Sequence, residues 1–209
     1  MDFMTVDKTK CVSCGACVAE CPVQIVSYDA KRLPMVEQEA QALCIQCGHC
    51  VAVCPKAALS LAASPLEQSP LLPAGWQLSL QQVEAFFKGR RSIRTFTDKP
   101  VDRSVLEKLI DIARYAPSGI NRQPVRWKIV DGKDRVHDLA GAVVDWTRAL
   151  IREKPEFAAS FRMEAFVSAW DEGKDRVLRA APAVVIAYGL KDDPLAPQAC
   201  TIAMAYLEL

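Results

Sequence analysis

The chain of 209 residues carries almost no net charge, because 26 basic residues are balanced by 25 acidic ones. This balance gives no general attraction to nucleic acid or to an anionic lipid surface, so neither is expected as a partner. No apolar stretch approaches the roughly 18 residues that a membrane-spanning helix needs. Residues 1–7 contain no basic segment followed by an apolar run, so no secretory signal is expected. Together these absences predict a soluble, cytoplasmic protein.

The sequence also lacks the motif G-x-G-x-x-G, so a dinucleotide-binding Rossmann domain is not expected. Cysteine is scarce after residue 54, where Cys200 alone remains. We interpret Cys200 as a buried thiol that packs as a small hydrophobic side chain. No side chain stands out as a general acid, so the sequence nominates no catalytic residue.

Eight of the nine cysteines fall in two runs with the same spacing, C-x2-C-x2-C-x3-C-P. The candidate metal ligands are Cys11, Cys14, Cys17 and Cys21 in the first run and Cys44, Cys47, Cys50 and Cys54 in the second. This spacing is typical of chains that wrap thiolates around cubane [4Fe-4S] clusters. Two runs in tandem predict two such clusters and a protein that moves single electrons.

These cysteines have two alternative uses, disulfide bonds and zinc binding. Disulfides are disfavoured because no export signal is present and the reducing cytosol opposes them. Zinc is the stronger rival, since paired C-x2-C motifs bind it through four thiolates. Zinc sites rarely need a third cysteine two residues further on and then a Cys-Pro pair, so iron–sulfur chemistry is preferred.

In two-cluster proteins with this spacing, the fourth cysteine of each run binds the other cluster. The predicted ligand sets are therefore Cys11, Cys14, Cys17 and Cys54 for one cluster and Cys21, Cys44, Cys47 and Cys50 for the other. Residues 4–61 resemble the bacterial two-cluster ferredoxins on these motifs. His49 lies between two ligands of a complete set, so we interpret it as a surface residue that at most tunes the potential.

Composition divides the chain into three parts. Residues 1–61 form the expected ferredoxin domain, with short strands at 5–6, 25–28 and 59–61 and short helices near Val18 and Val51. Such a small domain cannot be held by apolar burial alone, so bound metal is expected to serve as its core. Residues 62–78 have three prolines, a glycine and no periodicity, which predicts a linker.

The third part, residues 79–209, has the composition of an ordinary globular domain. Helices are predicted from Ser79 to about Lys88, from the capping residue Asp102 to before Pro117, and over 133–152, 157–171 and 198–209. Strands are predicted at 125–130 and 183–188. This irregular alternation of helices and strands predicts an α+β fold.

Two motifs in this part suggest a binding site. Residues 90–94 read Arg-Arg-Ser-Ile-Arg; such a charge run is usually a solvated face, but guanidinium groups also bind phosphate oxygens bidentately. Residues 116–124 read Ala-Pro-Ser-Gly-Ile-Asn-Arg-Gln-Pro. This segment could be a plain polar turn, or a loop that lays backbone amides against a polar planar ring, with Gly119 allowing close approach.

With these two motifs and the strand at 183–188, residues 80–209 resemble the nitroreductase family of flavoenzymes. The resemblance implies an α+β fold, an intertwined homodimer and FMN at the subunit interface. It implies that Arg90 and Arg94 hold the FMN phosphate, and that Arg91 and Ser92 line the phosphate and ring region.

The resemblance further implies that Pro117, Ser118 and Gly119 reach the flavin from the partner subunit and that Asn121 lies near the ring edge. Members of the family usually continue past the last helix into a glycine-rich strand segment and a basic stretch. Here the chain stops at Leu209 inside an apolar helical pattern. We therefore expect the second domain to be truncated at its C-terminus.

The predicted function is that of an iron–sulfur flavoprotein oxidoreductase. Electrons from a low-potential donor would pass through the clusters and FMN to a small-molecule acceptor, such as a nitroaromatic or a quinone. NAD(P)H is the other expected donor, and it would reduce the flavin directly. The alternative is a non-catalytic electron carrier or redox sensor whose second domain binds a partner.

Overall fold

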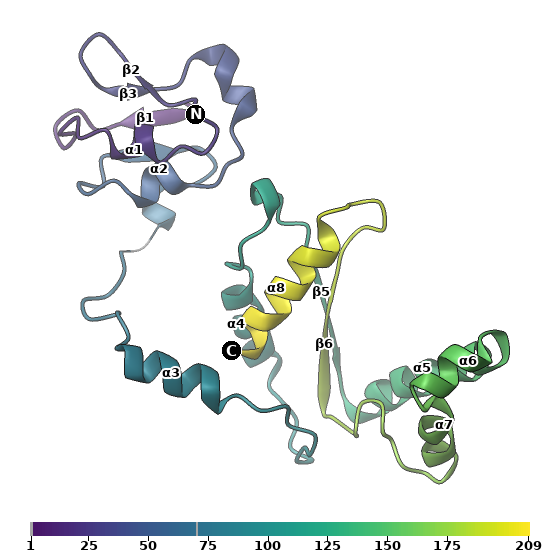
Figure 1. The fold of residues 1–209 in the computed structure, drawn as a ribbon. Helices are drawn as coiled ribbons and strands as arrows, with labels where there is room; N and C mark the ends of the chain where they lie inside the picture. Colours follow the sequence, from purple (N-terminus) through teal and green to yellow (C-terminus); the bar gives the residue numbers. More distant parts are fainter. Residues whose placement is uncertain (1, 70) are drawn as a thin grey trace. The chain divides into compact units, whose positions relative to one another are not determined.

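The computed structural model describes residues 2–69 and 71–209, which form two compact units (Figure 1). The first unit contains Met1–Gln82 and Gly119–Arg122, and the second contains Val83–Ser118 and Gln123–Leu209. Met1 and Pro70 lie outside the described residues. The structure therefore does not test the predicted linker at Pro70, nor the predicted absence of a secretory signal at Met1. Each unit has its own small sheets and its own buried side chains.

Two antiparallel strand pairs frame the first unit. Strand β1 (Met4–Val6) pairs with β4 (Leu59–Leu61), and β2 (Ser27–Tyr28) pairs with β3 (Pro34–Met35). Three short helices lie between these strands in the sequence: α1 (Ala16–Ala19), η1 (Gln38–Leu43) and α2 (His49–Ala52). A fourth, η2 (Leu66–Gln68), follows β4. The predicted strand at 25–28 is therefore shorter than expected, and β3 and η1 were not predicted.

The apolar core of the first unit is small. Its buried members are Cys50, Val51, Leu59 and Leu61, against which partly buried side chains from β1, η2 and the cysteine runs pack. A domain of this size buries too little apolar surface to be stable without a further cross-link. The fold therefore depends on what its cysteines hold.

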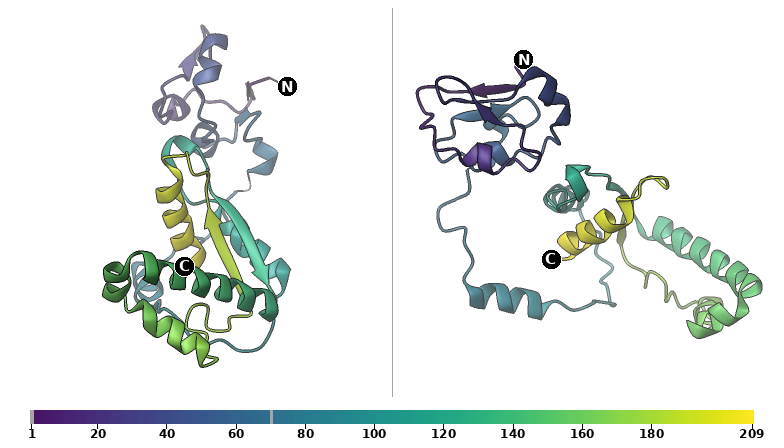
Figure 2. Two further views of the ribbon diagram at one scale, coloured as in Figure 1. Left: turned by 90° about the vertical axis from the view of Figure 1, so that its right-hand side faces the viewer. Right: turned by 45° about the horizontal axis from the view of Figure 1, so that its top comes forward.

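The second unit is built on the antiparallel pair β5 (Arg126–Asp131) and β6 (Ala183–Tyr188), in which Arg126 lies opposite Tyr188. Helices α4 (Arg103–Ala113) and α8 (Ala196–Glu208) contact each other and this pair, as Figures 1 and 2 show. Helices α5 (Lys133–Glu153), α6 (Pro155–Ser160) and α7 (Met163–Asp171) form a second packed group. The mixture of helix and strand confirms the predicted α+β class.

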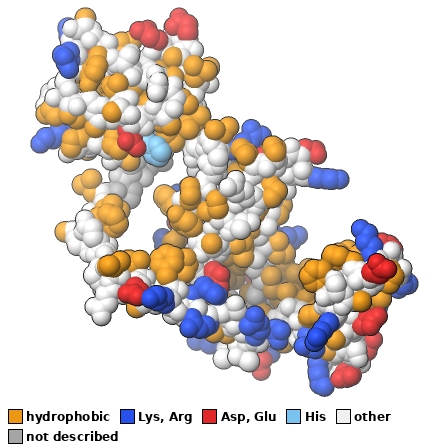
Figure 3. Space-filling view, viewed as in Figure 1, with side chains coloured by type: hydrophobic (Ala, Val, Ile, Leu, Met, Phe, Trp, Pro, Cys, Tyr) orange, Lys and Arg blue, Asp and Glu red, His pale blue; other side chains and the backbone are white. Residues whose placement is uncertain are grey.

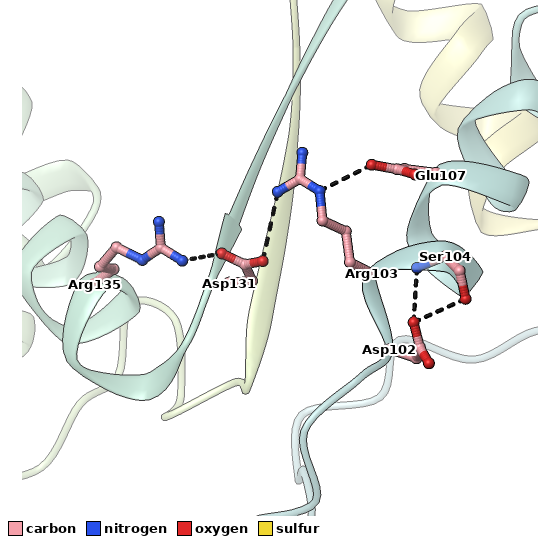
Figure 4. Close-up of polar contacts among 6 residues, drawn as sticks. All are labelled: Asp102, Arg103, Ser104, Glu107, Asp131 and Arg135. Atoms are coloured by element: carbon pink, nitrogen blue, oxygen red, sulfur yellow. Dashed lines mark hydrogen bonds and ion pairs between the residues drawn. The ribbon is translucent and has the colours of Figure 1, made fainter.

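A chain of charged contacts fixes the start of α4 to the end of β5 (Figure 4). The predicted cap is confirmed, because Asp102 Oδ1 accepts a hydrogen bond of 2.8 Å from the Ser104 backbone N–H. Arg103 bonds Glu107 at 2.8 Å and lies 3.5 Å from Asp131, the last residue of β5. Arg135 of α5 also pairs with Asp131, so one carboxylate links three elements.

The predicted helix over 157–171 is wrong, because two helices occupy this range. Arg162 has a left-handed backbone (φ 52°) and separates α6 from α7. The apolar pattern continues across this residue, so periodicity alone could not reveal the break. The last helix also begins earlier than predicted, at Ala196, with Pro197 in its first turn.

Much apolar surface of the second unit faces solvent. Helix α3 (Leu80–Gly89), which crosses the boundary between the units, exposes Leu80 by 84%, Phe87 by 58% and Phe86 by 51%. Figure 3 shows such hydrophobic side chains over this part of the chain. Clustered exposed apolar side chains mark an interaction surface. Among the described residues no helix is both long and apolar enough to cross a bilayer.

Candidate functional site

The two cysteine runs repeat one backbone conformation. Gly15 and Gly48, each directly after the second cysteine of its run, cap α1 and α2 with left-handed backbones (φ 82° and 70°). Ser13 and Gln46, directly before that cysteine, are also left-handed, with φ 52° and 54°. These matched turns bend each loop around a central point, so that successive thiols face inward.

The thiols are thereby sorted into two rings. The first thiol ring consists of Cys11, Cys14, Cys17 and Cys54, which line one hollow. The second thiol ring consists of Cys21, Cys44, Cys47 and Cys50, which line another. Each ring thus combines three cysteines of one run with the fourth cysteine of the other.

The ring geometry suits a cluster better than a single ion. In the described part of the chain, no three His, Cys, Asp or Glu side chains come close enough together to hold one metal ion. Four thiols from two runs that line one hollow match a cubane, whose corner irons each take one thiolate. A single Zn²⁺ would need all four sulfurs within about 2.3 Å of one point. The donor set and its spacing therefore fit a [4Fe-4S] cluster in each ring.

Burial disfavours the thiolate form of two of these cysteines as long as no metal is bound. It raises the pKa of Cys50 to about 11, and burial likewise raises the pKa of Cys17. Metal ligation removes these protons, so binding is coupled to pH and to folding. Backbone N–H groups assist at two sulfurs: Gln46 donates to Cys44 Sγ at 3.4 Å, and Ala58 donates to Cys54 Sγ at 3.2 Å.

A tyrosine that the sequence did not single out closes the first thiol ring. Tyr28 lines its space, and a Cβ atom placed on Gly15 would lie 2.5 Å from the Tyr28 hydroxyl. At the matching glycine of the second run, Gly48, the nearest atom is Ser64 Oγ at 3.1 Å. No local sequence signal connects a tyrosine thirteen positions away with a glycine.

The candidate phosphate-binding arginines follow α3 and are all exposed. Arg90 Nη1 bonds Glu208 Oε1 of α8 at 2.8 Å and lies 3.4 Å from Ser92 Oγ. Arg91 donates to two backbone carbonyls at 2.6 and 2.7 Å, and Arg94 donates to the Ser92 carbonyl at 3.3 Å. Glu208 is a partner that the sequence did not reveal, because 118 positions separate it from Arg90.

Arg90 and Arg91 line a hollow of about 550 Å³ together with Phe86, Ile93 and Glu208. Guanidinium groups beside apolar side chains suit a ligand with a phosphate at one end and a planar ring at the other. The residues present therefore fit FMN. In that case Arg90 would hold the phosphate with Arg91 beside it, and Glu208 would share the Arg90 guanidinium. The other two candidates, Ser92 and Arg94, do not line this hollow.

The second motif lines a different hollow. Pro117 and Ser118 face a space of about 220 Å³ beside α4, β5 and α8. Ser118 Oγ accepts a 2.9 Å hydrogen bond from the Gln123 backbone N–H, which closes the loop. Among the described residues, the two predicted parts of the flavin site thus line separate hollows.

The loop between Ser118 and Pro124 is strained. Ile120, Asn121 and Gln123 have φ angles of 46°, 53° and 45°. A positive φ is a true outlier for a β-branched residue, and such strain gathers at binding sites. Gly119 opens the short helix η3 (Gly119–Asn121), and within the first unit Asn121 Nδ2 donates to the carbonyls of Ile45 and Gln46, both at 3.0 Å. Proximity of Asn121 to a flavin ring stays a prediction.

Two family profiles match the chain, one within each of the two domains predicted from the sequence. The profile described as "Nitroreductase family" matches residues 87–209, more than half of the chain. The profile described as "4Fe-4S dicluster domain" matches residues 10–59.

Individual nitroreductases also match the chain, over shorter lengths than the family profile. Chloronitrobenzene nitroreductase of Comamonas testosteroni is 30% identical over 76 residues, which are 36% of this chain and 34% of that protein. Nitroreductase NfnB of Mycolicibacterium smegmatis is 37% identical over 76 residues, 36% of this chain and 32% of that protein. The chain thus spans about a third of the length of these curated relatives.

Two solved structures also align with part of the chain. A nitroreductase-like protein of Bacillus cereus aligns with a TM-score of 0.45 and 25% identity, over 63% of this chain and 65% of that one. A nitroreductase of Bacteroides fragilis with bound FMN aligns with a TM-score of 0.46 and 18% identity, over 61% and 62%.

Proposed function

Because the chain belongs to the nitroreductase family and carries a 4Fe-4S dicluster domain, we propose that it is an iron–sulfur flavoprotein oxidoreductase. It passes electrons from two [4Fe-4S] clusters to FMN and on to a conjugated small-molecule acceptor, of which nitroaromatics and quinones are the leading classes. Bound FMN would supply the conversion between one-electron carriers and a two-electron acceptor. The residues of the chain bind, orient and insulate these groups.

The observation that carries this proposal is the pair of thiol rings. Each ring holds four cysteines around its own space, and each draws its fourth cysteine from the other run. This arrangement supports two clusters with crossed ligands, since one run alone could not complete either ring. Two one-electron carriers attached to a flavin-type domain favour an enzyme that is fed one electron at a time.

FMN binding is assigned to both motifs of the second unit. Arg90 and Arg94 would hold the phosphate, with Arg91 and Ser92 beside it. The separate hollow of Pro117 and Ser118 supports a second role for that loop, as the part that a partner subunit contributes together with Gly119 and Asn121. The proposed assembly is accordingly a homodimer, for which the exposed apolar side chains of α3 offer surface.

A cytoplasmic location belongs to the same proposal. All nine cysteines are free thiols, and the described chain contains no disulfide. Cytosolic reductants keep thiols in this state, whereas secretory compartments oxidise them. Eight thiols available for iron are thus best preserved in the cytoplasm.

The test is anaerobic reconstitution followed by metal, sulfide and flavin analysis. The proposal expects about eight iron and eight sulfide atoms per chain, one FMN, and turnover of a nitroaromatic with a reduced donor. Clusters without FMN or turnover would instead identify a carrier or sensor. Iron well below that content would refute the cluster assignment.

Arg90→Ala tests the phosphate assignment. Loss of a charge-assisted donor costs on the order of 1.5–3 kcal/mol, and partial exposure of Arg90 favours the lower end, about a tenfold loss of FMN affinity. Arg152→Ala, which removes an exposed arginine of α5, is the matched control and should leave FMN affinity unchanged. Equal FMN affinity in the wild type and the Arg90 variant would contradict the assignment.

A further inference from the structure

The two thiol rings share one backbone but differ in the charges around them. Lys8 and Lys10 precede the first run, and Lys56 lines the first ring directly. At the matching positions of the other run stand Gln41, Leu43 and Val23, none of them charged. Because the two runs share the same ligand geometry, this difference in charge is not needed to hold a cluster.

Strand pairing brings these lysines together. In the antiparallel β1–β4 pair Val6 lies opposite Leu59, and one step further the Asp7 N–H bonds the Ala58 carbonyl at 2.7 Å. The ladder thus places Lys8 at the same end of the pair as Lys56. Neither lysine has an ion-pair partner among the described residues, and both are exposed.

Two further cations belong to the same surface. Lys10 is 3.3 Å from Asp7, in the turn where the Cys11 N–H bonds the Asp7 carbonyl. The Arg32 guanidinium lies 5.3 Å from the centre of the Tyr28 ring, which lines the first thiol ring. We call Lys8, Lys10, Arg32 and Lys56 the basic rim. Figure 3 shows basic side chains along the left side of this unit, apart from the acidic groups at its top.

The first ring is also the more accessible one. Cys14 is the only exposed thiol among its four cysteines, and Val12, two positions earlier in the same loop, is 57% exposed. In the second ring Cys50 is buried and no thiol is exposed. Because electron tunnelling falls steeply with distance, a partner reaches a cluster best where a ligand and an apolar side chain meet solvent.

The surroundings of the second ring are acidic instead. Its lining residues Phe3, Cys21 and Val36 are each adjacent in sequence to an acidic residue, and no lysine or arginine adjoins its lining. These acidic residues are Asp2, Glu20 and Glu37, and all three are assigned to the exposed or half-buried surface. Two carboxylates, Asp7 and Asp29, adjoin the lining of the first ring, but the four cations of the basic rim outnumber them. An acidic protein is therefore attracted to the first ring and repelled from the second.

We propose that the basic rim is the docking surface of an acidic one-electron carrier protein, which delivers electrons to the cluster of the first thiol ring. The inference rests on the proposed function. In each encounter the carrier loses one electron and this cluster gains it. Two encounters supply the two electrons that the acceptor takes up, with protons from water.

Binding is tested without turnover. The oxidised form of an acidic plant-type [2Fe-2S] ferredoxin is titrated calorimetrically into anaerobic, reconstituted full-length protein at low salt. Lys8→Glu combined with Lys56→Glu should raise Kd about tenfold or more, and high salt should remove the difference. Lys10 is left in place because its contact with Asp7 supports the turn before Cys11.

The control variant carries Lys99→Glu and Lys191→Glu, which change net charge equally and lie outside the first unit. It should bind like the wild type. Equal weakening in both variants, or no weakening in either, would overturn the inference. If the Glu variant fails to assemble clusters, Lys8→Gln with Lys56→Gln replaces it and should raise Kd severalfold.

Stopped-flow reduction gives the second readout. Reduced ferredoxin should bleach the clusters of the Lys8/Lys56 variant about tenfold more slowly than those of the control, while dithionite reduces both equally. Unchanged FMN content and dithionite-driven turnover would show that the proposed function stands even where docking fails. Binding to phosphatidylserine vesicles that the variant loses, with ferredoxin reduction unchanged, would assign the surface to lipid and refute the inference.

Discussion

Gly15→Ala is the substitution to which the first thiol ring should be most sensitive. Gly15 has φ 82°, which an alanine adopts only at a cost of roughly 1–2 kcal/mol. The added Cβ would also lie 2.5 Å from the Tyr28 hydroxyl, so the tyrosine must move. Overpacking of this kind typically adds about 1–3 kcal/mol.

The internal repeat supplies a matched comparison. Gly48→Ala has the same backbone cost, since φ there is 70°, but its nearest neighbour is the flexible Ser64 hydroxyl at 3.1 Å. We expect Gly15→Ala to cost roughly 1–3 kcal/mol more than Gly48→Ala. Tyr28→Phe should recover that difference, because the closest remaining ring atom would be 3.8 Å away.

The assay follows cluster loss in anaerobic protein challenged with an iron chelator, by the decay of visible absorbance. Cluster loss is irreversible, so a rate rather than an equilibrium is measured. An extra cost of about 1–3 kcal/mol corresponds to loss about 5–160 times faster than in Gly48→Ala. Equal rates for the two glycine variants, or failure of Tyr28→Phe to slow the loss in Gly15→Ala, would refute this account of the ring.

Two further predictions address the ligand sets and the second unit. Cys54→Ser should alter the electron paramagnetic resonance signal of the cluster that Cys11 helps to hold, whereas Cys21→Ser should alter that of the other; the opposite pattern would show that the runs are not crossed. Burial alone raises the pKa of Asp175, but hydrogen bonds from the backbone N–H groups of the following loop outweigh it and lower the pKa. The resulting stability is present above the unfolded pKa, near 4, and is lost as pH falls through the folded value. Asp175→Asn should therefore cost about 1–2 kcal/mol at neutral pH, screened by solvent, and flatten the acid limb of a urea-unfolding series; an unchanged pH profile would contradict this.

Local rules predicted most elements of the fold. Asp102 was expected to cap a helix because its carboxylate can accept an unpaired N–H group, and it does so at Ser104. Strand β6 was expected from a continuous apolar run, and β5 from a strand-like segment ended by Asp131 and Gly132. By contrast η1 (Gln38–Leu43) is polar and alanine-rich without a helical period, so nothing in its sequence announced it.

The features that escaped prediction depend on distant contacts. The sequence around Arg90 predicts a phosphate ligand, but it does not predict the ion pair with Glu208, which forms because the end of α8 lies beside the end of α3. The Tyr28–Gly15 contact likewise depends on the β2–β3 hairpin. Arg162 breaks a helix through its backbone conformation, which carries no periodic signal. Chemistry encoded by spacing was therefore predictable, and chemistry encoded by tertiary packing was not.

The proposed linker explains why only one of the two electron-transfer steps needs a docking surface. Joining two modules by a short flexible segment gives an effective concentration on the order of millimolar, so transfer between the units requires little binding energy. An external carrier has no such tether and reaches its target by diffusion, at a rate that complementary charge raises by about 10–10³-fold. Evolutionary selection for surface charge then acts on the surroundings of the thiol ring that binds the carrier. The basic rim around Cys14 and the acidic residues around the second ring match this division of labour.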